Sequence, residues 1–271
     1  MAKIGVRKMF YAIFSADDTY TGCTKFGKIS TFNFTPTSSN VKDYGDDVIT
    51  EVSNELQGGT LSVEANQLTL EEQGILLGHD YDDDVLVVAA DDQAPYVGVG
   101  AIAVELASGV KQYVAKWYKK LKFHEPNDEN STKQESVAFG HTTIEADVIP
   151  QGDNKISIGQ VFETEKGAET WIRTQAGDTF SAKLTDLDVG ELTLTPTFSS
   201  NTTSYTAATT NAKDKITFTT ESDYATVVIA SDDAEIAPDG TAEWDAGQNV
   251  VTVSVTDGSQ SKVYTVTVTK S

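Results

Sequence analysis

The chain has 271 residues, of which 39% are hydrophobic and 23% are charged, and its net charge at pH 7 is −21. This length allows one or two domains with a real core, whereas the single cysteine, Cys23, excludes a disulfide framework and a cysteine-rich zinc site. The acidity argues against a protein that wraps DNA, and apolar runs far shorter than the roughly 20 residues of a membrane span argue against membrane insertion.

Alternating apolar and polar residues, many of them β-branched, predict strands through the first two thirds of the chain. We expect these strands over residues 3–14, 25–35, 59–65, 85–90, 96–105, 111–123, 135–149 and 155–163. Residues 35–56 are polar and contain Pro36 and Gly45, so they are predicted to form a long loop. A loop of that length in a compact domain usually carries function or becomes ordered against a partner.

Two short helices are predicted within this β-rich part. Thr69 and Glu72 have the spacing of a capping box, an apolar stripe follows them, and Gly78 is a suitable helix stop. A second helix is expected over residues 165–176, where an apolar face recurs at helical spacing and Gly177 follows. That face contains Ala168, Trp171, Ile172 and Gln175.

The sequence becomes Thr-rich and regularly alternating from about residue 186. We therefore predict one domain over residues 1–182, a linker over 183–190, and a β-sandwich over 191–271. The sandwich strands are expected over residues 192–195, 204–209, 215–220 and 225–230, with a hairpin of 249–256 and 262–269 that turns after Asp257-Gly258. The predicted fold class is mainly β (α+β), and both parts are acidic, with net charges of −13 for residues 1–182 and −8 for 183–271.

The sequence shows no catalytic constellation. A Gly-x-Ser-x-Gly elbow, a phosphate-binding glycine-rich loop and a Cys–His pair are all missing, so neither an enzyme nor a cofactor is expected. Four aspartates between residues 80 and 91 have calcium-loop spacing, but Val85 stands where that loop needs Gly. This favours a solvated acidic turn, and the three histidines lack a second ligand at metal-binding spacing, so no metal site is predicted.

One basic cluster interrupts the acidic sequence. Five lysines between residues 111 and 122 are interleaved with aromatic residues. Such mixtures occur on nucleic-acid-binding surfaces, but in a strand the aromatic side chains can turn inward while the lysines face water. We favour a solvated face, or a contact with an acidic neighbouring subunit, over nucleic-acid binding.

Several short segments, in the order in which they occur, together carry a resemblance to a known family. They are residues 4–12 (IGVRKMFYA), 76–79 (LLGH), 85–88 (VLVV), 90–98 (ADDQAPYVG) and 117–123 (WYKKLKF). Over roughly residues 1–180 the sequence resembles the major tail proteins of long-tailed, non-contractile bacteriophages. Residues 198–205 (FSSNTTSY) and 262–268 (KVYTVTV) resemble bacterial Ig-like or cadherin-like β-sandwich repeats, without the calcium-ligand motifs of true cadherins.

The resemblance implies a tail-tube domain in which two β-sheets form a barrel-like sandwich flanked by a helix. Six copies would join their sheets edge to edge in a ring, and stacked rings would form a tube that conducts the genome into the host. The implied partners are further copies of the chain and the tape-measure, tail-terminator and distal-tail proteins, and the implied location is the virion tail, assembled in the host bacterial cytoplasm. DNA would pass through the lumen without specific binding, and the C-terminal sandwich would decorate the outside.

Candidate assembly residues follow from this interpretation. The polar segment and the basic cluster supply the expected contacts between subunits or rings, and runs of acidic residues supply the expected lumen. The contact candidates are Pro36, Asn40, Asp43, Tyr44, Asp46, Asp47, Lys119 and Lys120. The lumen candidates are Asp46, Asp47, Glu71, Glu72, Asp82, Asp83, Asp84, Asp91 and Asp92.

An alternative function belongs to a different class of protein. The C-terminal sandwich could adhere to host-surface glycans, with the N-terminal domain as its carrier on the virion. Aromatic side chains that could stack on sugars are few, and some must serve the sandwich core. They are Tyr205, Tyr224, Trp244 and Tyr264.

Overall fold

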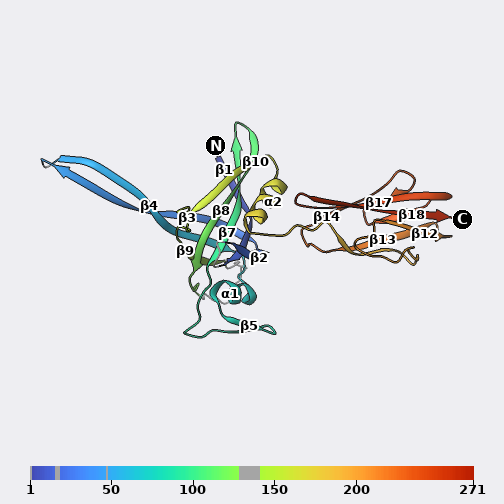
Figure 1. The fold of residues 1–271 in the computed structure, drawn as a ribbon, viewed down its shortest axis with the longest axis horizontal. Coiled ribbons are helices and arrows are strands. Elements are labelled where there is room, and N and C mark those ends of the chain that lie inside the picture. The colour runs from blue at the N-terminus through green and yellow to red at the C-terminus, as the bar shows by residue number, and fades with distance from the viewer. Residues whose placement is uncertain (1, 16–18, 47, 128–140) are drawn as a thin grey trace, which may run out of the picture. The chain divides into compact units, whose positions relative to one another are not determined.

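The computed structural model describes residues 2–15, 19–46, 48–127 and 141–271. The chain is mostly β, as the sequence predicts, and it divides into two compact units, Met1–Asp178 and Thr179–Ser271. The first unit contains one large sheet and two helices, and the second is a sandwich of two small sheets (Figure 1).

The large sheet of the first unit is antiparallel throughout. Its strands are β1 (Ala2–Phe14), β2 (Tyr20–Lys25), β3 (Ile29–Gly45), β4 (Val48–Ala65), β7 (Val97–Ala107), β8 (Val110–Phe123), β9 (Thr142–Val148) and β10 (Ser157–Phe162). They are ordered β2-β1-β7-β8-β9-β4-β3, and β10 pairs with β8 beside that path. The strands predicted over residues 3–14, 59–65, 96–105, 111–123 and 155–163 are confirmed. Part of the strand predicted over 135–149, residues 135–140, lies outside the described residues.

The main core of this unit lies inside the curl of the sheet. β3 packs against β1 although the two strands do not pair, so the sheet closes part of the way into a barrel. Met9 and Tyr11 of β1 are buried there with Leu61 and Val63 of β4 and Leu121 of β8. The spacing of two between the residues of each pair is what places them on one face of a strand.

The outer face of the same sheet is covered by α2 (Glu165–Gln175), which packs on β1, β7 and β8. Two glycines of β7 make room for this layer. A Cβ at Gly98 would lie 2.4 Å from the Trp117 ring, and one at Gly100 would lie 2.6 Å from that ring and 3.2 Å from Ile172 of α2. The glycines are therefore required by close packing between helix and sheet.

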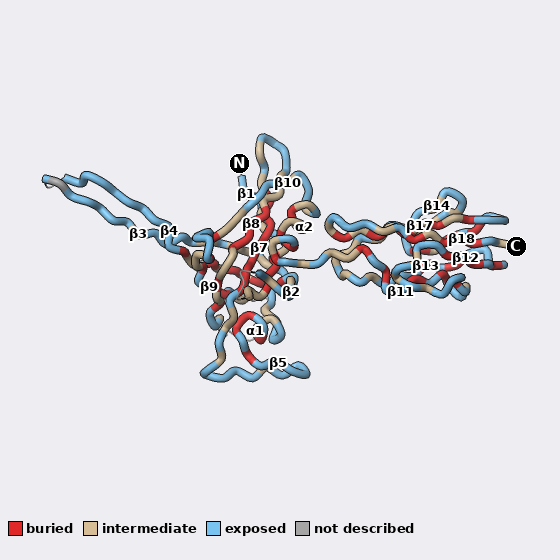
Figure 2. Tube along the Cα trace, in the orientation of Figure 1, coloured by how far each residue is buried: buried red, intermediate tan, exposed pale blue. Residues whose placement is uncertain are grey.

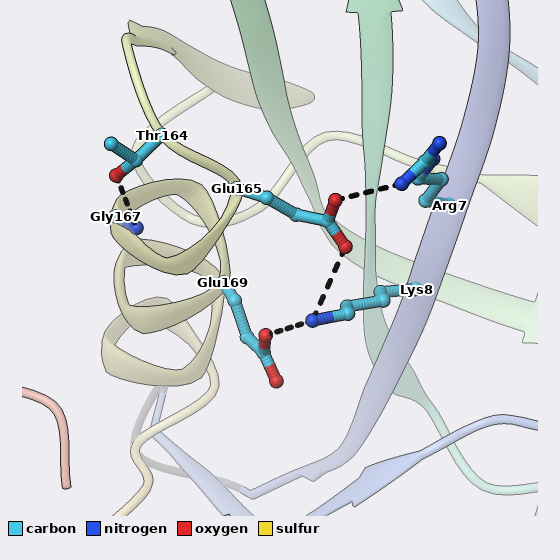
Figure 3. A network of polar contacts seen from close by, with 6 residues as sticks. All are labelled: Arg7, Lys8, Thr164, Glu165, Gly167 and Glu169. Atoms are coloured by element: carbon cyan, nitrogen blue, oxygen red, sulfur yellow. Dashed lines mark hydrogen bonds and ion pairs between the residues drawn. The ribbon is translucent and has the colours of Figure 1, made fainter. Parts of the chain in front are cut away.

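Figure 3 shows how ion pairs fasten α2 to β1. Lys8 sits at an irregularity in the β1–β7 pairing with a positive φ of 45°, and this directs its ammonium toward the helix. Glu165 lies 2.9 Å from Arg7 and 3.2 Å from Lys8, and Lys8 also pairs with Glu169. Burial would raise the pKa of Glu165, but the Lys8 and Arg7 charges outweigh it and hold that pKa below its ordinary value.

The first helix, α1 (Leu70–Leu77), begins and ends as predicted. The Thr69 N–H donates to Glu72 Oε2 at 2.9 Å, the Glu72 N–H donates to Thr69 Oγ1 at 3.1 Å, and Gly78 ends the helix at φ 80°. The strand predicted over residues 85–90 is only β6 (Val85–Val87), paired with β5 (Asp80–Asp82) across a turn. Among the described residues, neither helix is long and apolar enough to cross a bilayer.

The second unit is a sandwich of two four-stranded sheets. The strands are β11 (Leu184–Val189), β12 (Ser204–Thr209), β13 (Lys213–Thr220), β14 (Thr226–Ser231), β15 (Glu235–Ile236), β16 (Thr241–Glu243), β17 (Gly247–Asp257) and β18 (Gln260–Lys270). One sheet is ordered β11-β13-β16-β15 and the other β12-β18-β17-β14. The predicted hairpin after Asp257 is confirmed, and its turn residue Gly258 has φ 55°.

Two predictions for this unit are wrong. Residues 183–190 are not a linker, because β11 pairs with β13 and buries Leu184 and Leu187 in the sandwich core. Residues 192–195 are not a strand, since only Thr195 forms a bridge, to Thr206. The short apolar run around Leu194 packs on the core without joining a ladder, and a periodic pattern alone cannot separate these two outcomes.

Candidate assembly interface

The segment predicted as a loop is instead a long two-stranded ribbon. β3 and β4 pair along their whole length, but β9 pairs with β4 only from Gly59 to Ala65. Residues 38–46 and 48–57, which we call the ribbon, therefore continue beyond the sheet, and almost all of these residues are exposed (Figure 2). At about 3.3 Å per residue, the projecting part of β4, from Val48 to Gly58, is roughly 35 Å long.

Local sequence explains where the ribbon leaves the sheet. Pro36 lies directly across from Gly59, on a strand edge where a missing N–H is tolerated, and the register shifts between Thr37 and Ser38. A Cβ on Gly58 would lie 2.3 Å from the Val148 carbonyl oxygen, and one on Gly59 would lie 2.3 Å from that of Thr35. These two glycines let β3, β4 and β9 approach one another closely at the base of the ribbon.

The ribbon carries an unusual amount of exposed apolar surface. Its exposed large apolar residues are Val41, Tyr44, Val48, Ile49, Val52 and Leu56. Tyr44 lies opposite Ile49, whereas Asp43 lies opposite Glu51 with Val41 two residues away on the same face. One face near the tip is thus apolar and aromatic, and the other is acidic. An isolated two-stranded ribbon of this kind gains stability by packing against a partner.

The large sheet also has open edges at both ends of its strand order, and β10, which pairs only with β8, adds a further one in the described residues. Within the described residues, β2 pairs only with β1 and β3 pairs only with β4. Each edge therefore offers backbone N–H and C=O groups that could pair with another chain. Asn40, Asp43, Tyr44 and Asp46 of the contact prediction lie on the ribbon, whereas Asp47 is outside the described residues.

The predicted contact lysines Lys119 and Lys120 are instead engaged within the unit. Lys119 Nζ lies 2.7 Å from Asp153 Oδ2. Lys120 Nζ lies over two aromatic rings, 4.8 Å from the centroid of Phe14 and 4.5 Å from that of Tyr96. Cation–π and ion-pair contacts satisfy both ammonium groups, so their assignment to a subunit contact finds no support in their surroundings.

The acidic candidates fall into two groups. Glu72 caps α1 and also accepts the Gly27 N–H at 3.0 Å, and Asp92 accepts the Ala89 N–H at 2.8 Å, so both carboxylates have structural roles. Asp84 accepts a hydrogen bond from the Tyr81 hydroxyl at 3.0 Å. The exposed remainder consists of Asp46, Glu71, Asp82, Asp83 and Asp91. Among the described residues, no group of three or more His, Cys, Asp or Glu side chains is arranged to hold a metal ion.

One of the three histidines, His79, is buried between two carboxylates. The His79 side chain is 2% exposed, with Nδ1 2.7 Å from Asp92 Oδ2 and Nε2 2.9 Å from Glu125 Oε1. The second contact is an ion pair without hydrogen-bond alignment. Burial lowers the pKa of His79, but the two carboxylates outweigh it and raise that pKa above its ordinary value.

This histidine makes local stability depend on pH. Because its folded-state pKa is raised, its contribution is complete below the unfolded value of 6.5 and is lost as pH rises through the folded pKa. We expect His79→Gln to speed hydrogen exchange over residues 70–92 about tenfold at pH 6, with a shrinking difference toward pH 9. Mass spectrometry of this region measures it, and the exposed His124 gives the matched control His124→Gln. Equal exchange in His79→Gln and the parent at every pH would contradict the assignment.

Three of the four aromatic residues suggested for glycan stacking belong to the sandwich core. Tyr205 and Trp244 are 2% exposed and Tyr264 is fully buried. The Tyr205 hydroxyl donates to the carbonyls of Ser199 and Thr202, and Trp244 Nε1 donates to Asp214 at 2.8 Å. Their ring faces are unavailable to a sugar, which leaves only the half-buried Tyr224 of that set.

Comparison with known families agrees with the geometry of the second unit. Residues 184–271 match the family of cadherin-like beta sandwich domains, and the match begins at the first residue of β11. This part of the chain is therefore a cadherin-like β-sandwich domain, as predicted from residues 198–205 and 262–268. No curated protein matches the chain.

The ribbon is the feature that sequence reasoning missed, although a signal for it exists. Thr50, Val52 and Leu56 lie at even spacing among polar residues, although Ile49 beside Val48 interrupts the alternation, and Gly45 with Asp46 provides a turn. The abundance of Ser, Asn, Asp and Glu hides this alternation, because apolar residues on a two-sided exposed ribbon need not outnumber polar ones. A prediction based on buried strands therefore assigns the segment to a loop.

Proposed function

We propose that this chain is a structural, non-enzymatic virion protein whose copies close into hexameric rings and stack as the tail tube of a long-tailed, non-contractile phage. The observation that carries the proposal is the exposed ribbon, continuous with a sheet whose end strands β2 and β3 each have an unpaired edge in the described residues. The resemblance of residues 1–180 to major tail proteins supports the same function and supplies the number of subunits.

The two kinds of surface suit two kinds of contact. The edges at β2 and β3 can join the sheets of neighbouring copies within a ring, which removes the exposed backbone groups through closure. The ribbon extends beyond the sheet and can reach a further copy in the same ring or the next one. A closed ring with projecting ribbons stacks without needing a second type of subunit.

The acidic surface fits a conduit that surrounds DNA without holding it. Negative charge repels phosphates, so a duplex can slide through an acidic bore. The carboxylates available for such a lining are the exposed ones at Asp46, Glu71, Asp82, Asp83 and Asp91, since Glu72 and Asp92 are occupied by structural hydrogen bonds. The cadherin-like domain would then decorate the outside of the tube, in the company of the tape-measure, tail-terminator and distal-tail proteins.

Purified full-length protein is expected to form rings or tubes in negative-stain electron microscopy. Sedimentation velocity over a range of protein and salt concentrations should show species much larger than the 29.1 kDa chain. A monodisperse monomer under every condition tried would refute the proposed function. Rings without tubes would support the proposed edge contacts within a ring and contradict the proposed stacking contacts between rings.

A further inference from the structure

A groove opens at one end of the curled sheet. Its volume is about 450 Å³, and its walls come from β1, β3, β7 and β8. Phe32, Phe34 and Tyr118 form one aromatic side, while the floor carries the small residues Gly5 and Ala103. A Cβ placed on Gly5 would meet no atom within 4 Å, so the groove is empty above the floor.

The groove holds a lysine without an acidic partner. Lys116 Nζ lies 4.8 Å from the Tyr118 ring centroid and 5.7 Å from that of Phe34, and no carboxylate of the described residues is within ion-pair distance of it. Lys3 and Glu105 also line the groove, and they are cross-strand partners in the β1–β7 register. Burial, and then the Lys3 charge, lower the pKa of Lys116, as expected where a cation lacks a counter-ion.

The acidic face of the ribbon carries charges of the opposite sign to the lysines of the groove. Asp43 and Glu51 are direct cross-strand partners, an arrangement that is destabilising for like charges. Asp43 accepts a weak hydrogen bond from Thr50 at 3.4 Å, and neither carboxylate is within ion-pair distance of a described Lys or Arg. Val41 lies on the same face and is 63% exposed. An apolar side chain beside two carboxylates fits a groove of aromatic rings that carries two ammonium groups, Lys116 and Lys3, against the one carboxylate of Glu105.

We propose that the groove receives the Asp43/Glu51 face of the ribbon from a second copy of the chain. Val41 would pack against the aromatic side of the groove, and the carboxylates would pair with Lys116 and Lys3. The contact is heterologous, because ribbon and groove are different surfaces, and such contacts build rings or filaments. The inference rests on the proposed function, since it names the acceptor surface for a contact between copies.

Charge reversal tests this pairing in the full-length protein. Lys116→Glu and Glu51→Lys are each expected to raise the protein concentration needed for assembly by about tenfold or more, and the double variant is expected to return it to within about threefold of the parent. Lys111→Glu is the matched control, because Lys111 lies on the same strand outside the groove and is expected to assemble normally. Gly5→Leu should block the groove sterically with the charges unchanged.

Circular dichroism and sedimentation velocity of each variant separate loss of contact from loss of fold. If the parent forms tubes and both Lys116→Glu and Gly5→Leu are folded and assemble equally well, the groove assignment fails while the proposed function stands. If the parent does not assemble, the function fails and the contact is tested by disulfide trapping. Mixed Val41→Cys and Val6→Cys chains, both with Cys23→Ser, are then expected to cross-link on oxidation, and no cross-link would reject the groove as well.

Discussion

Replacing residues 38–57 by an Asn-Gly turn is expected to abolish tube formation while the first unit stays folded. The ribbon contributes none of the buried core residues, and the nearest ones in β4, Leu61 and Val63, lie beyond Gly59. Thr37 and Gly58 are direct cross-strand partners, so a two-residue hairpin turn can join them. The deletion removes the projecting contact surface and little of the energy that holds the sheet together.

Negative-stain microscopy and sedimentation velocity measure the assembly, and near-UV circular dichroism measures the fold. The point variant Val41→Ser should weaken assembly in the same direction, and Val110→Ser is its matched control. Both valines are 63% exposed, but Val110 lies at the start of β8 and outside the ribbon. Normal tubes from the deletion variant would show that stacking uses another surface, whereas a lost near-UV signal would show that the ribbon supports the fold.

What the sequence could predict was local. The capping box at Thr69 and Glu72 and the turn after Asp257 depend on residues within a few positions of one another, and both appear as predicted. The linker predicted over 183–190 was wrong, because a change in composition marks that stretch as a junction and only the pairing of β11 with β13 shows that Leu184 and Leu187 are core. Burial that depends on a distant strand has no short-range signal.

The candidate interface was predictable only in part for the same reason. The sequence singled out the segment around Asp43 and Tyr44 as a contact candidate but predicted a loop there, whereas the structure shows a two-stranded ribbon. It also chose Lys119 and Lys120 from a run of lysines that look equivalent in sequence. Asp153 and the rings of Phe14 and Tyr96 occupy those two lysines, whereas Lys116 of the same strand has no acidic partner among the described residues. Those neighbours come from distant parts of the chain.

A chain that ends at residue 178 is expected to assemble into tubes without the cadherin-like domain. The cut belongs at 178 because the second unit begins at Thr179 and its first strand, β11, begins at Leu184. Ending at residue 185 would leave Ala182 and Leu184 exposed, although both are buried in the full chain, and the resulting apolar tail could cause aggregation. A clean truncation therefore separates assembly from nonspecific association.

Negative-stain microscopy of residues 1–178 should show tubes thinner than those of the full chain, with the ribbon deletion in the same truncated chain as a negative control. The complementary fragment, residues 179–271, is expected to be a folded monomer with one cooperative thermal transition, since Tyr205, Trp244 and Tyr264 are buried within its own core. The boundary leaves −13 of the net charge on the first unit and −8 on the second. If residues 1–178 fold but no longer assemble, the assembly surfaces include the cadherin-like domain, and its charge can no longer be assigned to the outside of the tube.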